Sequence, residues 1–319
     1  MALKYFLAFL LSVFFAGQAQ AANDFTAWFA GFEAQARAQG ISAQTLLKTK
    51  PYISFEPSVI RLDQRQPEKK ITFAAYLKRT LPSSRVAQAR RLYHKHFHEL
   101  REAQRRTGIP AHVIVALWGI ESSFGAVTGG YDVLSSLATL AYEGRRSAFF
   151  TAELLHALHI VQDNKIPPSA LQGSWAGAMG QCQFMPSTYR RYAVDGDGDG
   201  RIDIWSSKAD VFLSIASYLK AEGWDPTLKW GRPVKLTRTL PPSVVGLKVK
   251  KKMRAWSHLG VRTATGKALP TYDVNVSLVQ PDGPKGKAYL VTDNYRALMR
   301  WNKSTYFATT VGLFSDQIH

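Results

Sequence analysis

The segment AHVIVALWGIESSFG, residues 111–125, constrains the fold more than any other stretch, because a long apolar run ends in a single carboxylate. Eight of the ten residues from Ala111 to Ile120 are apolar. The Gly-Ile-Pro sequence just before the run and Gly125 at its end are typical helix boundaries. The segment therefore predicts a core helix that ends close to Gly125.

Glu121 lies on an apolar face of this predicted helix. Ile114, Leu117 and Trp118 precede it by seven, four and three residues, so the four side chains share one face. Burial and the negative end of the helix dipole both raise the pKa of such a carboxyl group. A carboxylic acid that stays protonated near neutral pH can serve as a general acid. The segment alone equally allows a structural Glu that pairs with an Arg or caps a backbone group.

Residues 1–21 have the pattern of a secretory signal peptide. Lys4 supplies a positive charge, an apolar stretch follows, and Ala19-Gln20-Ala21 fits the small-x-small cleavage rule. We expect a periplasmic mature chain from about Ala22 without a stable membrane anchor; a retained N-terminal anchor is the alternative. The single cysteine, Cys182, excludes an internal disulfide and is interpreted as a small buried hydrophobe, not a nucleophile.

The net charge of +18 favours an anionic partner. Nucleic acid, anionic lipid and an acidic cell-wall polymer all have this property. Export argues against nucleic acid, and charge alone does not choose between the other two.

The pattern along the chain predicts a mainly α-helical protein with a small β part, an α+β class. Residues 22–108 predict an N-terminal helical region that includes one long helix over 84–106. Region 109–225 begins with the core helix. In region 226–292 Pro, Thr and Val become frequent, which indicates short strands with turns. Residues 293–319 close the chain and are helical at least in part.

A second block, GSWAGAMGQCQFMPSTYRRY at 173–192, has the composition of a carbohydrate-binding cleft wall. Its small residues allow a backbone to approach a ligand closely. Its aromatic residues offer flat faces for sugar rings, and its uncharged polar residues can bind hydroxyl and N-acetyl groups. The aromatic residues are Trp175, Phe184, Tyr189 and Tyr192, and the polar ones are Ser174, Gln181 and Gln183.

Four motifs together resemble the MltB family of lytic murein transglycosylases: IESSFG, SWAGAMGQCQFMPSTY, a D-x-D-x-D-G loop and SIASYLKAEGW. The resemblance runs from about residue 25 to the C-terminus and is densest over 109–224. It implies a lysozyme-like, mostly helical fold, with 109–225 as the catalytic core and 293–319 returning to the cleft. It also implies cleavage of the β-1,4 bond between N-acetylmuramic acid and N-acetylglucosamine in peptidoglycan, leaving a 1,6-anhydromuramoyl end. The expected partner is the glycan strand, the expected state is a monomer, and no organic cofactor is expected.

The resemblance also assigns site residues. Glu121 becomes the single catalytic residue, acting first as acid and then as base, while the C6 hydroxyl of the sugar attacks in place of water. Ser174, Gln183, Tyr218 and Asn302 become substrate-binding residues. The chain departs from the family at Trp301, where an aromatic hydroxyl is common. A hydrolytic muramidase and a non-catalytic wall-binding protein remain as alternatives.

The acidic loop DGDGDGRIDIWS, residues 195–206, follows the EF-hand calcium pattern. Hard oxygen donors at alternate positions converge on one ion, and glycine at position 6 permits the turn. Position 12 departs from the pattern, because Ser206 stands where a bidentate Glu is usual; the family resemblance makes the later Asp210 the closing carboxylate. The expected structural calcium ligands are Asp195, Asp197, Asp199, Arg201 at position 7, and Asp210. The alternative is an Asp-rich turn that caps the helix predicted over 209–222.

Overall fold

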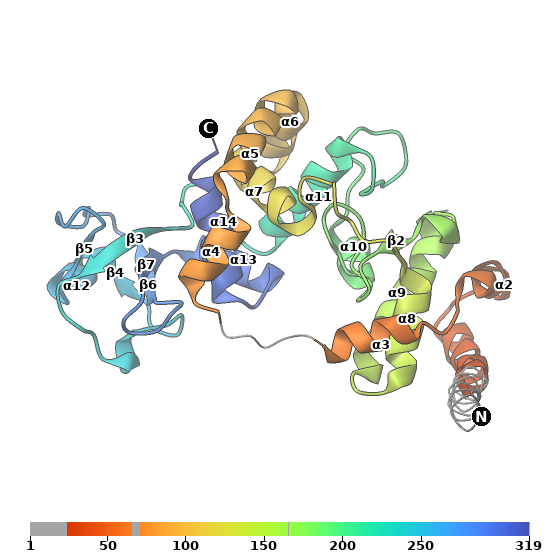
Figure 1. Ribbon diagram of the computed structural model, residues 1–319. Helices are drawn as coiled ribbons and strands as arrows, with labels where there is room; N and C mark the ends of the chain where they lie inside the picture. Colours follow the sequence, from red (N-terminus) through yellow and green to blue (C-terminus); the bar gives the residue numbers. More distant parts are fainter. Residues whose placement is uncertain (1–23, 66–70, 165, 319) are drawn as a thin grey trace, which may run out of the picture. The chain divides into compact units, whose positions relative to one another are not determined.

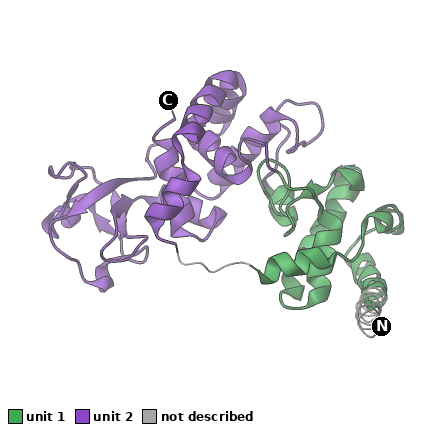
Figure 2. Cartoon of the chain, viewed as in Figure 1, with its two compact units in different colours: residues 1–67, 128–191 green, residues 68–127, 192–319 purple. Residues whose placement is uncertain are grey.

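The chain forms two compact units that alternate along the sequence, coloured separately in Figure 2. The computed structural model describes residues 24–65, 71–164 and 166–318. Unit 1 comprises residues up to 67 together with 128–191, and unit 2 comprises 68–127 and 192–319. The expected signal peptide at 1–21 lies outside the described residues. In the ranges described, no helix has the length and apolar character needed to cross a membrane.

Unit 1 is built around α8, which packs against α9 and α3 (Figure 1). Residues 24–38 form a further helical segment, whose Phe25 and Trp28 rings pack against Tyr142 of α8. The helices of unit 1 are α2 (Ala43–Thr49), α3 (Pro57–Gln64), α8 (Val133–Glu143), α9 (Ser147–Asn164) and α10 (Pro186–Tyr192), with 3-10 turns η1 (Lys50–Tyr52) and η2 (Pro168–Ala170). The last residue of α10, Tyr192, already belongs to unit 2. Strands β1 (Tyr131–Asp132) and β2 (Gln172–Gly173) pair antiparallel.

Unit 2 places α7 at the centre of a helical group. α7 (Ala111–Ser122) packs against α5, α6, α11 and α14, and its residues from Val113 to Gly119 are all buried. The surrounding helices are α4 (Phe73–Thr80), α5 (Ser83–Lys95), α6 (Phe97–Thr107), α11 (Lys208–Ala221), α13 (Asp293–Trp301) and α14 (Thr305–Ser315). The predicted core helix is confirmed.

A five-stranded antiparallel sheet completes unit 2, in the order β4-β6-β7-β3-β5. Its strands are β3 (Gly231–Leu236), β4 (Lys251–Lys252), β5 (Val261–Thr263), β6 (Asn275–Val279) and β7 (Ala288–Val291), with η3 (Pro242–Val244) and α12 (Met253–His258) between them. The fully buried Trp256 of α12 donates a hydrogen bond from Nε1 to Val276 O at 3.0 Å, which fixes the helix to the sheet. The strands predicted between 226 and 292 are confirmed. The residues expected to form the core, 109–225, are divided between the two units, so those region boundaries stay a prediction.

The single long helix predicted over 84–106 is wrong, because the chain breaks at His96 into α5 and α6. His96 has φ −107° and ψ 31°, outside the helical region. Its ring packs edge-on against Trp118 and Phe212, each with centroids 5.8 Å apart. Packing of this ring into the core therefore outweighs the continuous helical pattern.

The contact between α14 and Trp230, the residue before β3, gives a first prediction. A Cβ added to Gly312 would lie 2.2 Å from the Trp230 ring, whereas a Cβ at the exposed helical Gly31 would meet nothing within 4 Å. We expect Gly312→Ala to lower the free energy of unfolding by about 1–3 kcal/mol through overpacking. The control Gly31→Ala should raise it by roughly 0.5–1 kcal/mol, because alanine favours a helix interior. Urea denaturation of the two variants checks this, and equal effects would contradict the packing found here.

Candidate active site

Glu121 occupies the penultimate position of α7, close to the predicted helix end. It shares one face of α7 with Ile114, Leu117 and Trp118, which are each at most 1% exposed. Glu121 itself keeps part of its surface accessible. An acidic side chain thus emerges from an almost wholly buried helix, as the sequence predicts.

The surroundings of Glu121 change its ionisation strongly. Burial raises the pKa of the carboxyl from 4.5 to about 7, and a hydrogen bond from Trp301 partly opposes this rise. Within the described part of unit 2, no second carboxylate contributes to the shift. The group can therefore both hold and release a proton near neutral pH.

Trp301, the last residue of α13, is the direct partner of Glu121. Its Nε1–H donates to Oε1 of Glu121 at 2.7 Å. The Trp301 ring meets the Tyr218 ring with centroids 4.7 Å apart and planes at 66°, and Tyr218 meets Tyr192 at the same centroid distance. Sequence reasoning noted Trp301 only as a departure from the family; the indole N–H was a signal that it could bind a carboxylate.

The turn after α7 is fixed by the residues of the IESSFG motif. Ser122 donates from Oγ to Trp118 O at 3.1 Å and accepts from Gly125 N at 3.0 Å. Ser123 and Phe124 adopt positive φ angles of 49° and 62°. The Phe124 ring covers Gly119, where a Cβ would lie 2.6 Å from the ring. The motif therefore ends the helix directly after Glu121.

Two further predicted site residues lie in unit 2. Tyr218, on α11, is 8% exposed, so it offers only an edge to a ligand. Asn302 follows Trp301 as the C-cap of α13, and its side chain is exposed. Glu121, Trp301 and Tyr218 thus form one contact group, and Asn302 is the next residue along the chain.

Ser174 and Gln183 lie in unit 1, within a compact turn structure. Ser174 Oγ accepts from Ala178 N at 3.0 Å. Gln183 has a φ of 51°, and its Nε2 donates to Thr128 O at 3.0 Å and Gly180 O at 2.9 Å. Both side chains are partly exposed. The side-chain amide of Gln183 is held in place by its NH₂ group, which leaves Oε1 as the atom that can accept from a ligand.

Part of the predicted cleft wall is wrong, because several of its residues belong to the core. Phe184 and Tyr189 are 2% and 1% exposed, so neither can stack on a sugar. Packing within the protein requires glycine at positions 173 and 177. An added Cβ at Gly173 would lie 2.2 Å from Ala178 O, and one at Gly177 would lie 2.4 Å from the Leu137 side chain. Cys182 is a fully buried thiol outside any disulfide, which confirms its interpretation as a core residue.

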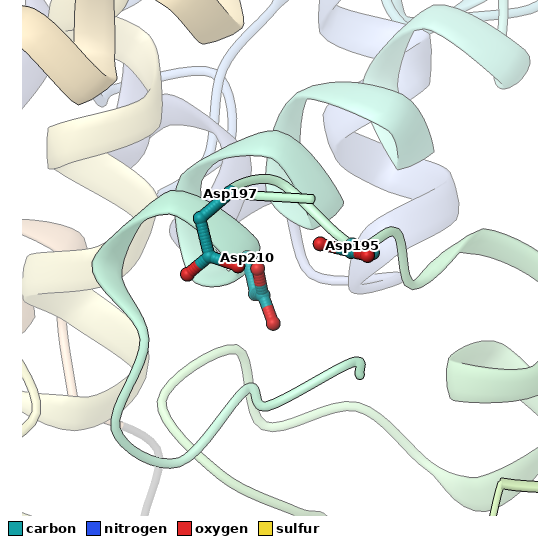
Figure 3. Close-up of side chains that lie close together, drawn as sticks. All are labelled: Asp195, Asp197 and Asp210. Atoms are coloured by element: carbon teal, nitrogen blue, oxygen red, sulfur yellow. The ribbon is translucent and has the colours of Figure 1, made fainter. Parts of the chain in front are cut away.

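Two carboxylates of the acidic loop lie close to a third from the first turn of α11, as Figure 3 shows. One oxygen from each of Asp195, Asp197 and Asp210 lies within 4.8 Å of the other two. Asp199 and Arg201 are outside this group, and both are exposed.

Asp210 ties the two ends of the loop together. It accepts hydrogen bonds from Gly196 N at 2.8 Å and from Asp203 N at 2.5 Å. Burial, and to a lesser extent the nearby Asp197, raises the pKa of Asp210. Oxygen donors at this spacing fit a hard divalent cation.

The pKa of Glu121 gives a prediction for stability against pH. Because the folded-state pKa is raised, the protonated group stabilises the fold fully below pH 4.5, and this contribution is lost as the pH rises through about 7. Relative to Glu121→Gln, which does not titrate, the wild type should lose up to about 3 kcal/mol across this interval. Urea unfolding of both proteins at pH 4.5 and 8 measures the difference, and a difference independent of pH would contradict the shift.

Known proteins are similar to this chain in sequence. A family model described as the transglycosylase SLT domain matches residues 24–316. The membrane-bound lytic murein transglycosylase B of Escherichia coli K12 is 33% identical over 239 residues, 74% of this chain. The chain spans 64% of the length of that relative.

Solved structures agree with this family. SltB3 from Pseudomonas aeruginosa, in complex with NAG-anhNAM-pentapeptide, has 42% identity and a TM-score of 0.88 over 92% of this chain and 78% of its own. The Escherichia coli lytic transglycosylase Slt35, in complex with calcium, has 28% identity and a TM-score of 0.76 over 93% of this chain and 91% of its own. The predicted mainly helical, lysozyme-like fold class is confirmed, and the chain belongs to the MltB-type family of lytic murein transglycosylases.

Proposed function

We propose that the chain is a lytic transglycosylase that cleaves the β-1,4 bond between N-acetylmuramic acid and N-acetylglucosamine in peptidoglycan. The observation that carries this proposal is Glu121, a single carboxyl group with a pKa of about 7 and one oxygen bound by Trp301. Most glycosidases use two carboxylates, whereas a lone group that titrates near neutral pH suits a reaction in which one residue serves twice. The relative SltB3 was solved with NAG-anhNAM-pentapeptide, which contains an anhydro sugar.

In the first step, protonated Glu121 gives its proton to the glycosidic oxygen as the C1–O bond breaks. The muramoyl residue then forms an oxocarbenium-like or N-acetyl-assisted intermediate at C1. In the second step, ionised Glu121 removes the proton from the C6 hydroxyl, whose oxygen bonds to C1. The products are the released glycan and a 1,6-anhydromuramoyl end, and Glu121 regains its proton without any water being consumed.

We assign substrate binding to Ser174, Gln183, Tyr218 and Asn302. The partly exposed amide of Gln183 and the exposed amide of Asn302 can bind hydroxyl and N-acetyl groups. Tyr218 supports Trp301 and offers its edge. The net charge of +18 suits a wall polymer whose stem peptides carry carboxylates, and we infer a monomer working in the periplasm after export.

The first test of this proposal is Glu121→Gln, which should lower the release of 1,6-anhydro muropeptides by at least about 10²-fold, because general acid–base catalysis is lost. Mass spectrometry of products from purified sacculi measures the release. Glu102→Gln is the matched control, since Glu102 is an exposed partner of Arg105 on α6. Reducing ends in place of anhydro ends would indicate a hydrolytic muramidase, and activity retained in Glu121→Gln would contradict the mechanism.

We also propose that the acidic loop binds calcium in a structural role. Asp195, Asp197 and Asp210 would supply carboxylate oxygens, and the EF-hand pattern adds Asp199 and the backbone carbonyl of Arg201. One oxygen from each of the three carboxylates lies within 4.8 Å of the others. Burial raises the pKa of Asp210, which makes its ionised form costly, and a bound cation would offset this cost. An ion here would join the segment before α11 to its first turn, and the relative Slt35 was solved in complex with calcium.

Calcium should raise the melting temperature of the protein, with a stabilisation of about 2–3 kcal/mol when free calcium exceeds Kd by a hundredfold. Asp195→Ala and Asp210→Ala should abolish the calcium-dependent part. Asp273→Ala should keep it, because Asp273 is an exposed partner of Lys252 in the β part. Identical melting of the wild type with calcium and with chelator would remove the proposal.

A further inference from the structure

We propose that Trp301 is a positioning residue that reserves one oxygen of Glu121, Oε2, for both proton transfers. The inference rests on the proposed function, because the two transfers belong to that reaction. It stands on the contact of Trp301 with Glu121 and on the side chains that hold the indole in place.

The direction of the hydrogen bond decides which oxygen carries the proton. Trp301 Nε1 lies 2.7 Å from Oε1 of Glu121. An indole N–H can donate but cannot accept. The carbonyl oxygen of a carboxylic acid is a stronger acceptor than its hydroxyl oxygen, so Oε1 is the carbonyl oxygen and the acidic proton resides on Oε2. Once Oε2 has given up this proton, Oε1 is still occupied, so Oε2 is again the oxygen that receives the next one. A single oxygen therefore faces both sugar oxygens in turn.

The indole is fixed by a closed set of contacts. The Trp301 ring packs against Tyr218, and Tyr218 packs against Tyr192. The Tyr192 hydroxyl donates to Oε1 of Glu222, the residue that follows α11. Arg300, next to Trp301, closes the set through an ion pair with Glu222, with Nε and Oε2 2.7 Å apart. Movement of the indole away from Glu121 would break its packing against Tyr218, which is itself packed against the anchored Tyr192.

The same hydrogen bond controls how easily Glu121 becomes a base. An N–H donor favours the charged form of a carboxylate, so Trp301 opposes the effect of burial. Without the donor, Glu121 would keep its proton to a higher pH, and as a weaker acid it would give that proton to the glycosidic oxygen less readily.

Other titratable groups surround this pair. From α4, Tyr76 interacts electrostatically with Glu121. From α5, Arg85 donates to Ser123 Oγ at 3.3 Å. Two further groups contact Trp118 of α7: His96, between α5 and α6, and Lys208 of α11. The last two are tyrosines: Tyr218 of α11 packs against Trp301, and Tyr306 of α14 packs against Tyr76. The shift of the Glu121 pKa has two causes, burial and the hydrogen bond from Trp301.

The test replaces the indole nitrogen without changing the ring shape. With 3-benzothienylalanine at position 301, sulfur takes the place of N–H; kcat should fall about tenfold to a hundredfold, which is the loss of one hydrogen bond to a charged group. KM should stay within about twofold. The alkaline limb of the kcat/KM profile should move up by roughly one pH unit, since the free enzyme then loses its acid at higher pH. Trp301→Phe should shift the profile in the same direction.

The matched control is the same replacement at Trp230. Its Nε1 also donates to a carboxylate, Asp316 Oδ2, at 3.0 Å. That replacement should leave kcat and the alkaline limb unchanged. An unchanged limb and unchanged kcat with the analogue at 301 would overturn the proposal, as would equal effects at both positions.

A second measurement does not depend on activity or on the variant at 301. With ¹⁵N-labelled tryptophan, one of the eight indole signals should shift with a midpoint near pH 7, and this shift should be absent in Glu121→Gln. If no indole signal follows Glu121, the positioning role is wrong. If the wild type makes no anhydro products although an indole signal does follow Glu121, the proposed function fails while the contact stands.

Discussion

The burial of one ionisable group, the carboxyl of Glu121, is the constraint on which the rest of unit 2 depends. A carboxylate next to a helix C-terminus and an apolar helix face is costly to ionise. The structure relieves this cost only in part, through a single N–H donor, so the pKa settles at about 7. Further donors would lower this pKa, and loss of the one donor would raise it. The intermediate value lets one residue act in both directions.

Several features of unit 2 then have a common purpose. α7 is covered by α5, α6, α11 and α14, which provides the burial. The IESSFG turn ends the helix directly after Glu121, and the residue keeps some accessible surface. The contacts of Arg300 and Glu222 join α13 to the end of α11 and hold the indole of Trp301 in place. The acidic loop precedes α11 in the chain, and the first turn of α11 contributes Asp210 to the group of three carboxylates.

Features that depend on local pattern could be predicted from the sequence. The core helix, the position of Glu121 near its end and the strands after residue 226 all follow from periodicity and boundary residues. The contact of Trp301 with Glu121 could not, because it joins residues 180 positions apart. The sequence also does not predict the break at His96 or the burial of Phe184 and Tyr189. Aromatic side chains look alike in a sequence whether they line a cleft or fill a core. Gly173 packs against the backbone of its own segment and Gly177 against Leu137, and composition cannot distinguish such packing from packing against a ligand.

Direct titration of Glu121 tests the central claim most closely. With glutamate labelled by ¹³C at Cδ, the resonance that disappears in Glu121→Gln identifies the group, and its chemical shift can be followed from pH 3 to 9 at a temperature where the protein stays folded. The account predicts a midpoint near 7. A midpoint near the ordinary 4.5 would show that burial does not control this carboxyl, and would contradict the use of Glu121 as both acid and base.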